Sequence, residues 1–187
     1  MSTATPNRFE GSQSLHRSTR RANRIARLTS VLAASLLASV ALFHPPLAKA
    51  SLQGATVTVA VYCCTAPPGP TSQVSNTVSG TVPASFPQGS LTGSKGDMSP
   101  IPVSLDVAAG QITLTSGGTF QAAGGSFNGY VYTFSGAPAI TKVTVDPLTS
   151  PSLVPTISFT STSIDVNVSG LQYATGGKQI LDITTAA

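Results

Sequence analysis

The sequence predicts an all-β protein: an antiparallel β-sandwich of about nine strands, jelly-roll or immunoglobulin-like, preceded by an N-terminal signal helix. Three observations lead to this prediction. Apolar residues alternate with Thr and Ser in short runs, which is typical of half-buried strands. Gly and Pro make up 27 of the 137 residues after position 50, and they separate the runs. No segment of this part repeats apolar residues at helical spacing.

The alternation places each strand in order along the chain. In the first run, Val57, Val59 and Val61 fall on one face, with Thr and Ala on the other. We expect strands at residues 55–62, 74–82, 101–108, 111–116, 128–135, 139–146, 156–161, 163–169 and 178–184. Residues 65–73 and 83–100 are expected to be loops, the second an unstructured surface loop because Gly, Ser and Pro dominate it.

Residues 1–50 have the organisation of a secretory signal peptide, which leaves residues 51–187 as a single β-sandwich domain. A basic segment is followed by the apolar run 28–43 and by the small residues Ala48 and Ala50. The alternative, a membrane-spanning helix, would need about 20 apolar residues, whereas this run has 16 residues in all and is interrupted by serines. We therefore predict cleavage near Ala50 and a secreted protein, extracellular or periplasmic, with no stable membrane anchor after cleavage.

The composition after residue 50 excludes several classes of function. Three lysines and five aspartates give a formal net charge of −2, so nucleic acid is not an expected partner. There is no His, Arg, Glu or Trp, which removes the base that Ser-His-Asp and Cys-His catalysis require. We predict that the protein is not an enzyme and has no catalytic residues, no cofactor and no transition-metal site.

Four residues are candidates for ligand binding. Asp97 and Asp146 could contribute oxygen ligands to calcium, although no dense calcium-binding loop surrounds them. Tyr130 and Tyr173 could stack on a sugar ring if they are exposed. The alternative for the first tyrosine is a core position, since aromatic residues at 130–134 share one face of a predicted strand.

Cys63 and Cys64 are the only cysteines, and they are adjacent. An exported protein retains disulfides, but Cα atoms about 3.8 Å apart lie closer than in ordinary ones. A vicinal disulfide would force a turn, which Pro67 and Pro68 could accommodate. The alternatives are an intermolecular disulfide through an exposed thiol, or two free thiols. No Cys-x-x-Cys spacing suggests a redox catalyst.

The segments FNGYVYTFSGAPAITKVTVDP (127–147), ISFTSTSIDVNVSGLQY (157–173) and ILDI (180–183) carry a resemblance. The chain resembles a group of small, uncharacterised secreted proteobacterial β-sandwich proteins related to exosortase-sorted surface proteins. FNGY and VNVSGL are the most distinctive parts. The resemblance implies export, a β-sandwich and no catalytic residues. Sorting is not expected, because the chain stops at Ala187 without a sorting tail. Taken alone, Asn128-Gly129 is typical of a turn or bulge.

These inferences predict an exported, non-enzymatic β-sandwich protein that works as a surface, matrix or interaction module. Its expected partner is a protein or glycan at a surface. The alternative is a small ligand-binding domain for carbohydrate or calcium.

Overall fold

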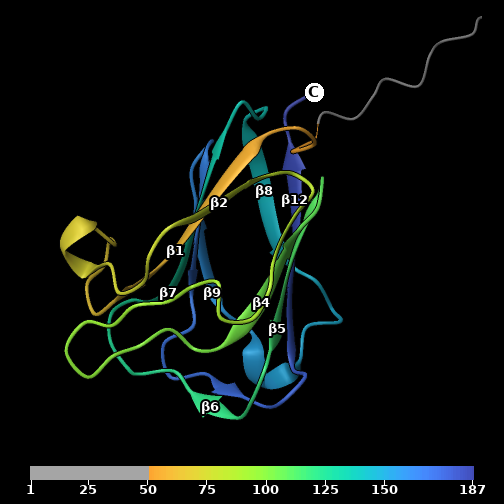
Figure 1. Cartoon of the computed structure of the whole chain (residues 1–187). Helices are drawn as coiled ribbons and strands as arrows, with labels where there is room; N and C mark the ends of the chain where they lie inside the picture. Colours follow the sequence, from red (N-terminus) through yellow and green to blue (C-terminus); the bar gives the residue numbers. More distant parts are fainter. Residues whose placement is uncertain (1–50) are drawn as a thin grey trace, which may run out of the picture. The chain divides into compact units, whose positions relative to one another are not determined.

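The computed structural model describes residues 51–187, which form an almost entirely β structure (Figure 1). The expected signal peptide and its cleavage point at Ala50 lie outside the described residues. The strands are β1 (Thr56–Cys63), β2 (Val78–Thr81), β3 (Ala84–Phe86), β4 (Val103–Val107), β5 (Gln111–Ser116), β6 (Phe120–Gln121), β7 (Asn128–Ser135), β8 (Ile140–Val145), β9 (Thr156–Phe159), β10 (Ser163–Asn167), β11 (Gln172–Tyr173) and β12 (Lys178–Thr185). Two short 3₁₀ turns, η1 (Pro70–Ser72) and η2 (Pro151–Leu153), complete this part of the chain.

Two five-stranded antiparallel sheets pack against each other, as the sequence predicts. The first has the order β2-β1-β7-β10-β9, and the second has the order β3-β4-β5-β12-β8. The short strands β6 and β11 form a separate antiparallel pair. Because β6 lies between β5 and β7 in sequence, and β11 between β10 and β12, this pair ties together two chain segments that cross from one large sheet to the other.

Alternation along the strands produces the core between the sheets. β1 and β7 pair over eight residues, from Thr56 opposite Ser135 to Cys63 opposite Asn128. Their inward positions are apolar or aromatic and are less than 10 % exposed. The facing residues of β4, β5 and β12 close the core from the second sheet. The inward-facing residues of these five strands are Val57, Val59, Val61, Tyr130, Tyr132, Phe134, Val103, Leu105, Val107, Ile112, Leu114, Leu181 and Ile183.

All nine predicted strands are present, and the 111–116 and 128–135 ranges match β5 and β7. The expectation of an unstructured loop at 83–100 is wrong. This segment contains β3, buries Phe86 and Leu91, and joins the preceding loop through a hydrogen bond from the Asn76 amide to the Thr92 carbonyl (2.6 Å). Apolar side chains within a Gly/Pro-rich segment supply the burial that holds it in place.

Within residues 51–187 no helix is long and apolar enough to cross a membrane.

Several chain segments meet at one end of the sandwich. β1 ends there at Cys63, β7 begins there at Asn128, and β10 ends there at Asn167. The segments 97–102 and 120–123 reach the same end, because their residues line a common pocket with these strand ends. We call this region, made of residues 63–64, 97–102, 120–130 and 167–171, the disulfide end.

Candidate ligand pocket beside the vicinal disulfide

Cys63 and Cys64 form a vicinal disulfide, the first of the arrangements that the sequence allows. Their Cα atoms are 3.7 Å apart. Consecutive side chains of a strand point to opposite faces, so the chain has to leave the strand to bring both sulfurs together. It does so at Cys64, which has a φ of +82° and is the only non-glycine residue with positive φ in the described range. The disulfide therefore ends β1, with Cys63 buried and Cys64 exposed.

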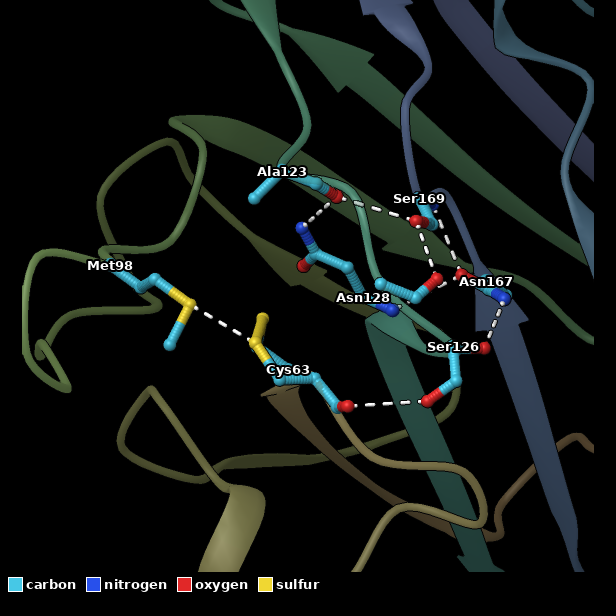
Figure 2. The surroundings of a disulfide bond; sticks show 9 residues. Cys63, Met98, Ala123, Ser126, Asn128, Asn167 and Ser169 are labelled. Atoms are coloured by element: carbon cyan, nitrogen blue, oxygen red, sulfur yellow. Dashed lines mark hydrogen bonds between the residues drawn. A yellow bond between two sulfur atoms is a disulfide. The ribbon is translucent and has the colours of Figure 1, made fainter.

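Hydrogen bonds from the segment before β7 hold this turn in place. The Cys64 amide donates to the Phe127 carbonyl (2.6 Å), and the Ser126 hydroxyl donates to the Cys64 carbonyl (3.2 Å). On the other side, the Met98 Sδ lies 3.3 Å from the Cys64 Sγ (Figure 2). Because a sulfur in a disulfide carries no hydrogen, this is a packing contact between sulfurs and not a hydrogen bond. The disulfide thus lies between two segments that are distant in sequence.

The two most distinctive segments of the resemblance, FNGY and VNVSGL, lie side by side at the disulfide end. The Asn128 amide donates to the Asn167 Oδ1 (3.1 Å), and the Val168 amide donates to the Asn128 carbonyl (2.7 Å). The Asn167 Nδ2 also donates to the Ser126 carbonyl (3.1 Å). Asn128 and Asn167 therefore hold these two segments together through their hydrogen bonds.

Gly129 lies where two backbones approach closely, which explains why a glycine follows Asn128. The prediction of a turn or bulge at Asn128-Gly129 is wrong, because both residues belong to β7 and pair with β1 in regular register, and Gly129 also pairs with β10. A Cβ at Gly129 would collide with the Val166 carbonyl oxygen on β10. The glycine is needed for this close approach and not for a turn conformation.

A pocket of about 420 Å³ opens at the disulfide end. Its floor is buried and almost entirely apolar, and it is formed by Val61, Cys63, Val74, Ala122, Gly129, Tyr130 and Val168. Its rim is more exposed and comes mainly from two segments, 97–102 and 120–123. An apolar floor with a few polar groups around it is the usual form of a site for a small molecule, and the volume falls in the range of such sites.

Four polar side chains line the pocket: Asp97, Ser99, Gln121 and Asn128. The Asn128 Nδ2 donates to the Ala123 carbonyl (2.9 Å), which fixes the orientation of its amide. Figure 2 shows the Asn128 amide oxygen on the side that faces the disulfide and Met98. Within the described residues this oxygen accepts no hydrogen bond. It can therefore accept one from a ligand.

The structure brings some of the predicted ligand-binding residues together and separates others. Asp97 is exposed at the pocket rim, whereas Tyr130 is 2 % exposed in the pocket floor, so it has the alternative core position and not an exposed stacking position. Tyr173 is 1 % exposed, so the prediction that it stacks on a sugar from solution is wrong. Asp146 does not line this pocket, and its Oδ1 accepts a hydrogen bond from the Leu148 amide (2.6 Å). Phe120, Gln121 and the side chain of Asn128 line the pocket without having been predicted.

Three tyrosines of the core lie close enough together for their hydroxyl groups to affect one another's pKa. Burial, the larger cause, raises the pKa of Tyr130, Tyr132 and Tyr173, and the neighbouring Tyr173 hydroxyl raises the pKa of the other two further. For Tyr173, the interaction with Tyr130 lowers the pKa and so opposes the rise that burial causes. That interaction is a weak electrostatic contact, because the Tyr173 hydroxyl has no partner in the described chain that meets the geometry of a regular hydrogen bond. The direction of these shifts keeps the three phenols neutral at physiological pH.

Comparison of the chain with protein-family models, with curated proteins and with solved structures found no match. Within residues 51–187 no three His, Cys, Asp or Glu side chains gather in a way that could hold a metal ion.

Proposed function

We propose that this protein is exported and works as a non-enzymatic interaction module, which binds its partner through the pocket at the disulfide end. The observation that carries this proposal is the pocket itself: a concave site with an apolar floor and unengaged polar groups at its rim. Export is supported by the signal-like pattern of residues 1–50 and by a disulfide, which persists in oxidising compartments. The resemblance to secreted surface proteins agrees with both parts of the proposal.

The chemistry of the pocket argues for binding and against catalysis. Among residues 51–187, Asp97 is the only carboxylate in its lining, and no lysine joins it. Glycoside hydrolysis requires two carboxyl groups that flank one bond, and acyl transfer requires a nucleophile with an adjacent base. Tyr130 remains protonated because burial raises its pKa, and Cys63 is held in the disulfide. A site with these groups can hold a ligand but has no pair of groups that could exchange protons with it.

Calcium, the other ligand considered, gains no specific support. The two aspartates proposed for it do not line the same site, and the carboxylate of Asp146 already accepts a hydrogen bond. Calcium sites use six to eight oxygen ligands, so Asp97 alone would be a poor one.

The proposal is tested by mapping where partners bind. The protein, exported from its full-length gene with ¹⁵N labelling, is mixed in turn with neutral saccharides, peptides and anionic phospholipid vesicles. At least one of these materials should shift the amide resonances of Met98, Gln121 and Asn128. Gly110 and Gly136, which lie in the loops beyond β4 and β7, serve as reference amides. No shift with any material, or shifts confined to the reference amides, would refute the proposal.

A further inference from the structure

We propose that the ligand of this pocket is a neutral saccharide, whose apolar faces pack on the disulfide, Met98 and Phe120 while its hydroxyl groups donate to Asp97, Gln121 and Asn128. This inference rests on the proposed function, because it names the class of ligand for the same site. Four features of the pocket support it: its charge, its hydrogen-bonding groups, its apolar surfaces and the part played by the disulfide.

The charge of the pocket disfavours anionic ligands. Of the residues that the structure describes, Asp97 is the only charged one in the lining, and residues 51–187 have a formal net charge of −2. Lys95 is the nearest cation in sequence, but it does not line the pocket. A phosphate, a carboxylate or an anionic lipid headgroup would meet a like charge with no compensating donor pair. A neutral ligand avoids this cost.

The hydrogen-bonding groups of the pocket favour a ligand that is rich in donors. The carboxylate of Asp97 and the Asn128 Oδ1 are both acceptors, and neither has a hydrogen-bond donor among residues 51–187. Ser99 and Gln121 line the rim with side chains that also make no hydrogen bond in the described part of the chain. Hydroxyl groups on a saccharide ring satisfy such acceptors directly. A purely apolar ligand would bury them without partners, which is unfavourable.

The apolar surfaces of the pocket suit the faces of a sugar ring, which carry C–H groups. Phe120 is 36 % exposed and lines the pocket. Its ring lies close to Gly118, where a Cβ would come within 2.6 Å of the Phe120 Cε2. The glycine therefore leaves room for the ring in this position. The disulfide, through Cys63, and the thioether of Met98 add polarizable sulfur surface to the lining of the same pocket.

The disulfide also positions the rim. Its Cys64 sulfur contacts Met98, the residue after Asp97, while hydrogen bonds from Ser126 and to Phe127 hold Cys64 against the segment before β7. Asp97 on the rim is thereby held at a fixed place relative to Asn128 on β7. Such preorganisation reduces the entropy that a ligand must offset on binding.

The experiment titrates the exported, full-length-gene product with a panel of neutral mono- and disaccharides, followed by amide shifts and by calorimetry. At least one saccharide should shift the amides of Met98, Gln121 and Asn128. The substitutions Asp97→Ala and Gln121→Ala should each weaken that saccharide about tenfold, the loss expected for one well-placed hydrogen bond in a desolvated site. Both residues are exposed, so the melting temperature should not change.

Two matched substitutions serve as controls. Asp106→Ala removes an exposed carboxylate on β4, and Gln172→Ala removes the exposed residue that pairs with Gln121 across β6 and β11; neither residue lines the pocket. Both should bind the saccharide as the unmodified protein does. Equal weakening by the controls, or no effect of the rim substitutions, would overturn the inference. If only a peptide or vesicle shifts the pocket amides, the saccharide is wrong but the binding function stands. If nothing shifts them, both fall.

Discussion

Gly129→Ala, although it adds only one methyl group, should strongly lower the free energy of unfolding of this protein. Gly129 lies in β7 between β1 and β10, and it pairs with Tyr62 and Asn167. The new Cβ would collide with the Val166 carbonyl oxygen, and it would lie 2.9 Å from the Val166 carbonyl carbon and 3.2 Å from the Asn167 Cα. All three are backbone atoms of β10, so no side-chain rotation can relieve the contact. The two strands have to separate at this point.

The cost follows from what the separation breaks. The hydrogen bonds from Val168 to Asn128 and from Asn128 to Asn167 lie next to the substituted residue, and each contributes about 1 kcal/mol. Overpacking adds about 1–3 kcal/mol. The free energy of unfolding should therefore fall by roughly 3–5 kcal/mol, against about 5–15 kcal/mol for a typical domain. For a domain of this size, that corresponds to a melting temperature lower by about 10–20 °C.

Thermal unfolding followed by far-ultraviolet circular dichroism measures this effect on the exported protein. Gly124→Ala is the matched control, because Gly124 belongs to the segment just before β7, has no positive φ, and would place its new Cβ more than 4 Å from neighbouring heavy atoms. Its free energy of unfolding should stay within about 0.5 kcal/mol of the unmodified protein. If both variants melt at the same temperature, the close approach of β7 and β10 is not what requires the glycine.

Two further predictions concern the cysteines and the buried tyrosines. The exported, unreduced protein should run as a monomer and have no thiol that reacts with iodoacetamide; two thiols reactive before reduction would contradict the vicinal disulfide. Because burial raises the pKa of Tyr130, Tyr132 and Tyr173 above 10.0, the folded state keeps protons that the unfolded chain loses there. The free energy of unfolding should be constant below about pH 10 and fall above it. Phenolate absorbance from these three residues should therefore rise only as the circular dichroism of the folded state is lost. Ionisation of these tyrosines while the protein is still folded would contradict the prediction.

The sequence predicts the long strands well because each contains enough residues to show alternation. β5 and β7, for example, have six and eight residues, and their bounds match the prediction. The strands that the pattern misses have two or three residues, which is too few for any period to be visible. β6 exists because Phe120 and Gln121 meet Tyr173 and Gln172 from a segment about fifty residues away. Pairing of this kind depends on the tertiary fold and not on local composition.

The candidate site is predictable only in part, for a similar reason. The adjacent cysteines allow a vicinal disulfide but also leave open an intermolecular disulfide or two free thiols, and Asp97 stands out in a segment with few charges. Gln121 and Asn128 give no such signal, because their importance comes from the segments that surround them in space. The prediction for Tyr173 fails because an aromatic residue near a chain turn resembles an exposed platform until its burial is known.

The position of the pocket follows from the place where β1 ends. A vicinal disulfide needs both side chains on one side of the chain, so Cys64 leaves the strand and β1 stops opposite Asn128. Beyond that point β1 contributes no further residue to the first sheet, and the segments 97–102 and 120–123 line the pocket there. These segments carry the rim residues but contribute no strand to the two large sheets. If the pocket binds a ligand as proposed, substitutions in these segments should change which ligand it holds while the sandwich stays intact.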